Sequence, residues 1–379
     1  MANKKTHIAF IIANSSNVPY FIWFAEKAKN NKEYCFSFIS LHHSKPEMEE
    51  EIKSLGSAFY WIPFDHRARK SSMLKVIPKL LSLFKNIKPD IVHCHLFDDS
   101  LPSLLAAKFL GIKTRIITKQ DTYFHWLYAP GIVKFDRLNN KLATHIVAVS
   151  EECKHFILEK EKAEASKVHL IHHGIRIDKL SKSEESIREE LIERFNLKNK
   201  IVVGTIARLI DWKGHMLILD VAEQLIKKHP NTVFLFVGQG ELKEKIEKTA
   251  EEKGISKNII LTGWIDREKI PSLFSLMDIY LHAAKYEPFG FVIAEAMLNA
   301  VPVLSTKTGA ALDAIEHKEN GYLVNYDSVN EFVDGFEFLL NADKVSIGEK
   351  GRLTAIKMYD FEVMWQSYIN LYAKAILEL

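Results

Sequence analysis

The chain has 379 residues, of which 47% are hydrophobic and 26% are charged, a composition typical of globular proteins. It excludes a disordered protein, a collagen and a disulfide scaffold. No apolar run approaches the roughly 20 residues needed to cross a bilayer, and no signal peptide is recognisable. The three cysteines are widely spaced, which is typical of a reducing compartment, so we expect a cytoplasmic protein.

The net charge of +3 conceals an asymmetry between the two halves of the chain. Residues 1–180 carry 27 Lys and Arg against 18 Asp and Glu, and the remaining residues carry 24 against 30. A nucleic-acid footprint would be more basic and more clustered, so we expect no nucleic-acid partner. The mild excess of positive charge in the first half favours an anionic acceptor or an anionic membrane surface as the partner of that half.

The first half alternates short, β-branched, apolar runs with longer amphipathic segments. We expect strands at His7–Ala13, Cys35–Leu41, Ala58–Ile62, Asp90–Cys94, Thr114–Thr118, His145–Val149 and Val168–Ile171. We expect helices at Phe21–Asn30, Met73–Ile87, Ser100–Leu110 and Glu151–Glu161. Nearly continuous apolar strands separated by helices predict a parallel sheet covered on both faces.

Residues 181–200 are charged and contain no strand pattern, so we place an interdomain linker and a lead-in helix there. A second α/β series follows. Its expected strands are Ile201–Ala207, Thr232–Val237, Asn258–Thr262, Asp278–His282, Val301–Ser305 and Gly321–Val324. Its expected helices are Met216–Lys228, Leu242–Lys253, Ile270–Leu276 and Phe291–Asn299, and the tail Phe361–Leu379 has the pattern of a long amphipathic helix.

These series predict two doubly wound α/β domains, at residues 1–180 and 195–358. We expect the last helix, at 360–379, to pack back on the first domain. Sheets of this kind bind ligands at the carboxyl ends of their strands. Two of them in tandem favour a central cleft between facing strand ends as the ligand site.

The most informative motif places two glutamates around a short Pro-Phe-Gly-Phe segment. Glu287 precedes, and Glu295 lies inside, a helix that follows the expected strand Asp278–His282. A helix N-terminus attracts anions, and a carboxylate one turn inside can accept two hydrogen bonds from a ribose diol. The alternative is a pair of solvated helix-terminal glutamates. The surrounding motif, together with Gly309-Ala-Ala after the next strand, favours the binding site.

Two cations form a second candidate site. Arg208 and Lys213 lie five residues apart, directly after the apolar strand Ile201–Ala207. Arginine offers a planar fork and lysine a compact charge, so together they can hold a diphosphate. The alternative is a pair of solvated loop cations.

Together these segments resemble the GT-B glycosyltransferases of family 4, whose signature is two glutamates separated by seven residues. Further matching segments begin at Asp90, Ile146, His173, Val237 and Leu261, and the tail from Tyr359 to Tyr372 looks like the closing helix of the family. The resemblance covers nearly the whole chain and is strongest over residues 200–325. It implies two Rossmann-like domains facing a central cleft and a retaining, nucleotide-sugar-dependent reaction.

The resemblance also implies roles for the four charged residues. Glu295 would bind the ribose of the nucleotide, and Glu287 would hold hydroxyls of the donor sugar. Arg208 and Lys213 would stabilise the leaving diphosphate, which gains negative charge as the glycosidic bond breaks.

Other donor contacts follow by the same resemblance. Phe289, Gly290 and Phe291 would present backbone groups to the sugar and the distal phosphate. Trp264 and Ile265, just past a strand end, would cradle the base.

The sequence departs from the family pattern at two loops. The loop after the first strand has no glycine near the donor phosphates and reads Asn-Ser-Ser-Asn-Val-Pro from Asn14. Many members have a histidine two residues after Thr118, where this chain has Gln120. A histidine follows at His125, and it either reaches the reaction centre or is an ordinary loop histidine.

No metal or cofactor is expected. His93 and His95 alternate with Cys94 on one strand. Successive side chains of a strand point to opposite faces, so the three residues cannot easily share an ion. The chain contains no Asp-x-Asp motif, so Arg208 and Lys213 would neutralise the leaving group without a metal. The nucleotide-sugar is a substrate, not a cofactor.

Residues 66–88 carry seven cations and no acidic residue, namely Arg67, Arg69, Lys70, Lys75, Lys79, Lys85 and Lys88. Their spacing predicts a basic amphipathic helix, which Pro78 would kink. Such a helix could lie on an anionic membrane, or it could cover the sheet with a solvated basic face.

We therefore expect a cytoplasmic hexosyltransferase-type enzyme, either free in the cytoplasm or peripheral on the inner face of the membrane. It would move a sugar from a nucleotide-diphospho-sugar, with UDP favoured, to a saccharide or glycolipid acceptor of surface polysaccharide synthesis. The alternatives are a nucleotide-sugar epimerase of the same fold and a non-catalytic sugar-binding protein.

Overall fold

A computed structural model describes residues 5–179 and 182–378, and it divides into two compact units. Unit 1 comprises the described residues of Met1–Val149, Cys153–Ile171 and Trp365–Leu379, and unit 2 those of Ser150–Glu152 and His172–Met364. The expected boundary at residue 180 and the first linker residue, Ser181, lie outside the described residues. The chain enters unit 2 earlier, at His172, because residues 172–179 pack with the second half.

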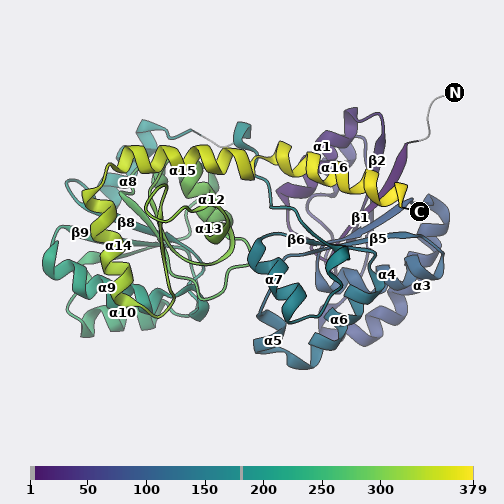
Figure 1. Cartoon of the computed structure of the whole chain (residues 1–379), viewed down its shortest axis with the longest axis horizontal. Coiled ribbons are helices and arrows are strands. Elements are labelled where there is room, and N and C mark those ends of the chain that lie inside the picture. The colour runs from purple at the N-terminus through teal and green to yellow at the C-terminus, as the bar shows by residue number, and fades with distance from the viewer. Residues whose placement is uncertain (1–4, 180–181, 379) are drawn as a thin grey trace. The chain divides into compact units, whose positions relative to one another are not determined.

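Unit 1 is built on a seven-stranded parallel sheet in the order β3-β2-β1-β4-β5-β6-β7. Its strands are β1 Thr6–Ile12, β2 Tyr34–Leu41, β3 Ala58–Ile62, β4 Ile91–Cys94, β5 Thr114–Lys119, β6 His145–Ala148 and β7 Val168–Leu170. Its α-helices are α1 Pro19–Asn30, α2 Glu49–Ser54, α3 Arg69–Ile87, α4 Phe97–Phe109, α5 Phe124–Tyr128, α6 Val133–Leu142 and α7 Glu151–Glu159, joined by α16 Phe361–Leu377. Helices cover both faces of the sheet (Figure 1).

The core of unit 1 is aromatic. The ring of Phe10 on β1 lies 4.7 and 4.8 Å from those of Phe21 and Phe24 on α1. It lies 5.8 and 5.7 Å from those of Phe36 and Phe38 on β2. Aromatic pairs at these separations add to the free energy gained by burying apolar surface, so β1, β2 and α1 form one packed layer.

The last helix completes this core. The Tyr372 hydroxyl lies 2.8 Å from His93 Nδ1, and the Tyr368 hydroxyl lies 3.0 Å from Thr118 Oγ1. All four side chains are buried. Because β4 and β5 supply the partners, α16 is fixed to the middle of the sheet of unit 1.

Unit 2 is built on a six-stranded parallel sheet in the order β10-β9-β8-β11-β12-β13. Its strands are β8 Ile201–Ile206, β9 Thr232–Val237, β10 Ile259–Gly263, β11 Ile279–His282, β12 Val303–Thr306 and β13 Tyr322–Val324. Its α-helices are α8 Glu185–Phe195, α9 His215–Lys228, α10 Lys243–Glu252, α11 Ile270–Phe274, α12 Phe291–Leu298, α13 Gly309–Ala314, α14 Val329–Asn341 and α15 Lys344–Tyr359.

The strand order of unit 2 reverses between β8 and β11. In doubly wound sheets this reversal opens a space at the carboxyl ends of the two central strands, where ligands bind. The loop after β8 contains Lys213, and the loop after β11 contains Glu287. The topology therefore brings together two residues that are 74 positions apart.

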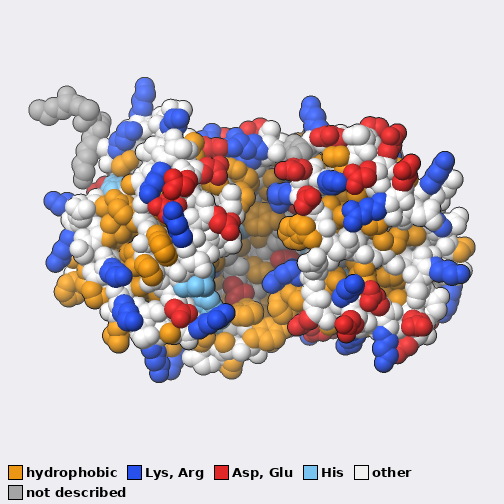
Figure 2. Space-filling view, turned by 180° about the vertical axis from the view of Figure 1, so that it is seen from behind, with side chains coloured by type: hydrophobic (Ala, Val, Ile, Leu, Met, Phe, Trp, Pro, Cys, Tyr) orange, Lys and Arg blue, Asp and Glu red, His pale blue; other side chains and the backbone are white. Residues whose placement is uncertain are grey.

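The structure confirms two parallel-sheet α/β domains. Helix α3 continues through Pro78. Its buried residues are Ser72, Val76, Leu80 and Phe84, so its apolar side covers the sheet and its lysines are exposed. Among the residues described, no helix combines the length and hydrophobicity that crossing a bilayer requires. Lys and Arg side chains lie among Asp and Glu side chains over the face seen in Figure 2.

Candidate donor and acceptor sites

Lys213 and Glu287 form a buried ion pair in unit 2. Lys213 ends a short 3₁₀ helix, η5 (Asp211–Lys213), and Gly214 follows with φ of +76°. A Cβ at Gly214 would lie 2.0 Å from the carbonyl oxygen of Ala283, so a glycine lets this loop lie against the chain that follows β11. Lys213 Nζ donates to Glu287 Oε2 across the gap.

A histidine contacts the same carboxylate. His282, at the end of β11, places Nε2 3.4 Å from Glu287 Oε2. Burial opposes ionisation of Glu287, but the interaction with His282 and the charge of Lys213 outweigh it and lower its pKa to about 2. Burial lowers the pKa of His282. Glu287 is therefore an ionised carboxylate over the whole physiological range.

The Pro-Phe-Gly-Phe segment turns sharply into α12. Gly290 has φ of +84°, and a Cβ there would meet Glu287 Cγ at 2.8 Å. Phe289 is buried, whereas Phe291 is 43% exposed. The glycine therefore lets the carboxylate of Glu287 lie close to the start of the helix.

Glu295 lies on α12 and is buried. Arg267 Nη2 donates to Glu295 Oε1 at 2.7 Å. Burial raises the pKa of Glu295 and Arg267 counteracts part of that rise. The arginine is 70% exposed, so it can leave the carboxylate at little cost when another hydrogen-bond donor arrives. Sequence reasoning missed Arg267, although it closely follows the Trp264 and Ile265 expected to hold the base.

The remaining predicted donor residues differ in their exposure. Trp264 is 70% exposed after the end of β10, whereas Ile265 is buried. Arg208 lies on the loop after β8 and is exposed. The structure thus pairs Lys213 with Glu287. Among the described residues Arg208 has no side-chain hydrogen bond or ion pair, so a joint clamp with Lys213 stays a prediction.

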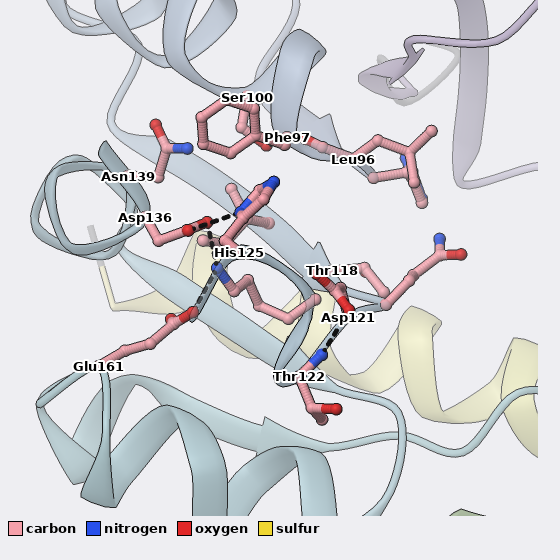
Figure 3. A pocket seen from close by; sticks show the side chains of 14 residues that line it. Leu96, Phe97, Ser100, Thr118, Asp121, Thr122, His125, Asp136, Asn139 and Glu161 are labelled. Atoms are coloured by element: carbon pink, nitrogen blue, oxygen red, sulfur yellow. Dashed lines mark hydrogen bonds and ion pairs between the residues drawn. The ribbon is translucent and has the colours of Figure 1, made fainter. Parts of the chain in front are cut away.

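Unit 1 contains a small polar cavity of about 80 Å³ at the carboxyl ends of β4 and β5. Both candidates for the missing histidine, Gln120 and His125, line it, as does His95. Figure 3 shows His125 beside Asp136, with Phe97 across the cavity. The ring centroids of Phe97 and His125 lie 4.5 Å apart. This contact with an apolar ring limits the orientations that the imidazole can adopt.

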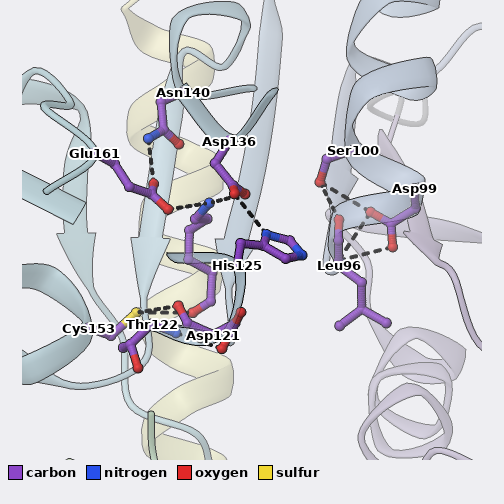
Figure 4. Close-up of polar contacts among 11 residues, drawn as sticks. Leu96, Asp99, Ser100, Asp121, Thr122, His125, Asp136, Asn140, Cys153 and Glu161 are labelled. Atoms are coloured by element: carbon purple, nitrogen blue, oxygen red, sulfur yellow. Dashed lines mark hydrogen bonds and ion pairs between the residues drawn. The ribbon is translucent and has the colours of Figure 1, made fainter. Parts of the chain in front are cut away.

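A chain of charges fixes His125. Its Nδ1 lies 2.8 Å from Asp136 Oδ2, and Lys119 Nζ lies 3.1 Å from Asp136 Oδ1 and 3.0 Å from Glu161 Oε1. Asn140 Nδ2 donates to Glu161 Oε2 at 2.6 Å (Figure 4). Burial opposes ionisation of Asp136, but His125 and Lys119 lower its pKa. An ionised carboxylate can only accept a hydrogen bond, so Nδ1 donates to Asp136, and in the neutral form of the imidazole Nε2 keeps the lone pair.

A buried carboxylate also holds the start of the loop that follows β1. Asp99 Oδ2 accepts the backbone N–H of Ala13 at 2.8 Å and that of Leu96 at 3.0 Å, and Asp99 is fully buried. Asp99 is the third residue of α4 and accepts the N–H of the residue that precedes the helix, while Asp98 pairs with Arg69 at 2.6 Å. The first N–H after β1 is already bonded within the protein.

Comparison with known proteins identifies the family. The model of the family described as "Glycosyl transferases group 1" matches residues 187–353, and that of "Glycosyltransferase Family 4" matches residues 34–179. The capsular polysaccharide biosynthesis glycosyltransferase CapM of Staphylococcus aureus is 24% identical over 323 residues, which cover 82% of this chain and 83% of CapM.

Two further relatives support the same family assignment. A poly(ribitol-phosphate) alpha-N-acetylglucosaminyltransferase of Staphylococcus aureus is 32% identical over 176 residues, which cover 45% of this chain and 35% of that enzyme. The crystal structure of HepE from Anabaena in complex with UDP superimposes with a TM-score of 0.80 at 18% identity, covering 97% of this chain and all of HepE. The two family models together match most of the chain, and the chain belongs to the GT-B glycosyltransferases of family 4.

Proposed function

We propose that this glycosyltransferase moves a sugar from a nucleotide-diphospho-sugar, with a UDP-sugar favoured, to a saccharide or glycolipid acceptor. The observation that carries this proposal is the ionised, buried Glu287, held by Lys213 and His282. A buried carboxylate is a strong acceptor for sugar hydroxyls. The likeness to a UDP-bound structure and to a capsular polysaccharide enzyme supports the donor class and the pathway.

The donor would exchange partners with the protein on binding. Sugar hydroxyls donate to Glu287, which frees Lys213 to approach the diphosphate. The ribose diol donates to Glu295 and displaces the exposed Arg267. Arg208 adds a second positive charge at the leaving group. The attraction between these two cations and the diphosphate is strongest as the diphosphate leaves. It therefore lowers the activation barrier as well as the KM.

We propose that the reaction retains anomeric configuration and requires no catalytic metal ion. Retention follows the family resemblance, in which the leaving phosphate accepts the proton of the acceptor hydroxyl on the same face of the sugar, so no protein nucleophile is needed. Lys213 and Arg208 supply the positive charge at the diphosphate, and the sequence contains no Asp-x-Asp motif.

The cavity of unit 1 is proposed to receive the acceptor. The buried Oδ1 of Asn139, which lines this cavity, has no hydrogen-bond partner among the described residues. A saccharide hydroxyl would satisfy it. His125 presents Nε2 as a second acceptor, with Asp136 fixing the tautomer. His125 is then a catalytic residue, and Asp136 positions it.

Contact with an anionic membrane is proposed for α3. The exposed cations on or beside this helix are Arg67, Lys70, Lys75, Lys79, Lys85 and Lys88, and Leu74 is 77% exposed among them. Since the apolar side of the helix already covers the sheet, attraction would be mainly electrostatic, at about 1 kcal/mol per cation near the surface. The enzyme would then work in the cytoplasm, at the inner face of the membrane.

The donor site is tested by Glu287→Ala and Lys213→Ala, assayed for sugar transfer from UDP-sugars. Both should lose at least about a hundredfold in kcat while the circular dichroism spectrum is unchanged. Lys253→Ala is the matched control, because Lys253 also pairs with carboxylates, those of Asp220 and Glu223, outside the site. Wild-type turnover in either site variant would refute the assignment.

Product identification separates the alternatives. Transfer that depends on added acceptor indicates a transferase, whereas conversion of the donor alone indicates an epimerase. Stabilisation by free sugar without stabilisation by nucleotide diphosphates would indicate a sugar-binding protein. Sedimentation with anionic vesicles at physiological salt tests the membrane contact, and a failure of the wild-type protein to bind would refute it.

A further inference from the structure

Three histidines that take no part in the sites above meet at one edge of unit 1. His42 and His43 follow β2, and His66 begins a short 3₁₀ helix, η1 (His66–Ala68), after β3. One ring nitrogen from each histidine lies within 4.8 Å of those from the other two. The ring centroids are separated by 4.2 Å for His42 and His43, and by 5.6 Å for His43 and His66. We propose that these three imidazoles bind a Zn²⁺ or similar borderline transition-metal ion.

The donor set decides the class of ion. Imidazole suits Zn²⁺, Cu²⁺ and Ni²⁺, whereas Mg²⁺ and Ca²⁺ prefer carboxylate, carbonyl and water oxygens. Three neutral imidazoles leave the fourth position of a tetrahedral Zn²⁺ ion open for water or an anion. The described residues of the cluster include no carboxylate ligand, so the site would select against Mg²⁺.

The backbone beneath two of the ligands is fixed. Trp61 Nε1 donates to the carbonyl oxygen of His42 at 2.8 Å, which ties the end of β2 to β3. Ser72 Oγ accepts the N–H of Asp65 and donates to its carbonyl, both at 3.1 Å, directly before His66. Metal ligands on a rigid backbone lose less conformational entropy on binding an ion than ligands on a flexible one. The two loops are therefore already near each other without the metal.

Metal binding requires two small adjustments. The Ser44 N–H donates to His42 Nδ1 at 3.2 Å, so Nδ1 holds the lone pair and the ion would replace Ser44 there. Two nitrogens at about 2.1 Å from one tetrahedral zinc ion lie about 3.4 Å apart, so separations of up to 4.8 Å in the cluster must close by as much as about 1.4 Å. His43 is exposed, and rotation of its side chain can supply this movement.

The ion would join two loops at the carboxyl edge of the sheet, the edge that also carries the cavity lined by His125. Because β2 and β3 pair only as far as Leu41 and Ile62, the segments beyond them are connected by few backbone bonds. A shared metal ion would hold them in one arrangement. This inference does not depend on the proposed reaction, because it concerns ion binding in the absence of any sugar.

The test is calorimetric titration of Zn²⁺ into the full chain, purified without a histidine tag and dialysed against a chelator. We expect one ion per chain, with affinity reduced by at least about tenfold in His43→Asn and in His66→Asn. His155→Asn is the matched control, because His155 is an exposed histidine on α7 outside the cluster, and it should bind as the wild type does.

A second measurement covers the case in which a variant loses binding by misfolding. His66→Cys supplies a thiolate, which is also a zinc ligand. It should restore binding, and with Co²⁺ as the probe it should add a sulfur-to-metal charge-transfer band to the visible spectrum of a four-coordinate site. Absence of Zn²⁺ binding in the wild type, or equal loss in the His155 control, would overturn the proposal.

Discussion

Substitution of Glu287 by glutamine should destabilise unit 2 at neutral pH. The pKa of Glu287 lies at about 2 against an ordinary value of 4.5. At about 1.4 kcal/mol per unit, this difference corresponds to about 3 kcal/mol of unfolding free energy that requires the ionised carboxylate. The side chains of Lys213 and Glu287 are only 15% and 11% exposed, so solvent screens the interaction little.

The pH dependence gives this prediction its sign. A carboxyl group with a lower pKa in the folded state stabilises the protein fully above pH 4.5, and the stabilisation is lost as the pH falls towards 2. The difference between the wild type and Glu287→Gln should therefore be about 3 kcal/mol at pH 7 and about 1 kcal/mol at pH 3. Urea-dependent hydrogen exchange, followed on peptides of unit 2, measures both values.

A surface carboxylate provides the control. Glu223 accepts hydrogen bonds from Lys227 at 3.0 Å and from Lys253 at 2.8 Å on the exposed side of α9. Exposed pairs of this kind contribute little to stability, so Glu223→Gln should unfold as the wild type does. The reasoning is refuted if Glu287→Gln lies within about 1 kcal/mol of the wild type at pH 7, or if the difference does not change with pH.

Three further changes have defined outcomes. Asp136→Asn should lower kcat at least about tenfold and leave the donor KM unchanged, because the substitution removes the carboxylate that fixes the His125 tautomer. Steady-state kinetics over pH 6–9 would measure this loss, and an unchanged kcat would exclude a positioning role for Asp136. Trp264→Ala should raise the donor KM about tenfold through lost stacking on the base, and a KM effect on the acceptor alone would contradict that placement. Tyr372→Phe should lower the unfolding free energy by about 1–2 kcal/mol, because the substitution leaves His93 Nδ1 without its buried hydrogen-bond partner. Thermal unfolding measures this change, and an unaltered melting temperature would count against the hydrogen bond between Tyr372 and His93.

Much of the fold could be predicted because its signal is local. The strand expected at Ala58–Ile62 has the same bounds in the structure, and that expected at His7–Ala13 differs from β1 by one residue at each end. Such runs are largely apolar, which is typical of strands in a covered parallel sheet. Helices α6 and α15 were not predicted. Helix α15 has almost no amphipathic pattern, so periodicity could not reveal it. Helix α6 is clearly amphipathic, so its pattern was available in the sequence.

The site could be predicted only in part, because its partners come from separate loops. The spacing of Glu287 and Glu295 marks them as a pair along the chain. It does not indicate that one is held by Lys213 and His282 and the other by Arg267. The chain of charges behind His125 was likewise invisible, since Asp136 and Glu161 belong to different elements and meet only through the buried Lys119.

The tyrosines of α16 have a consequence for biosynthesis. His93 and Thr118 are translated long before Tyr372 and Tyr368, yet they find their hydroxyl partners only in that late helix. A nascent chain that has emerged as far as Ile171 would therefore expose an unfinished apolar layer around Phe24, which Trp365 covers at a ring distance of 5.2 Å. Unit 2 is synthesised in the interval. Ribosome-bound intermediates of this length should bind chaperones, and release from them should await the appearance of α16 from the exit tunnel.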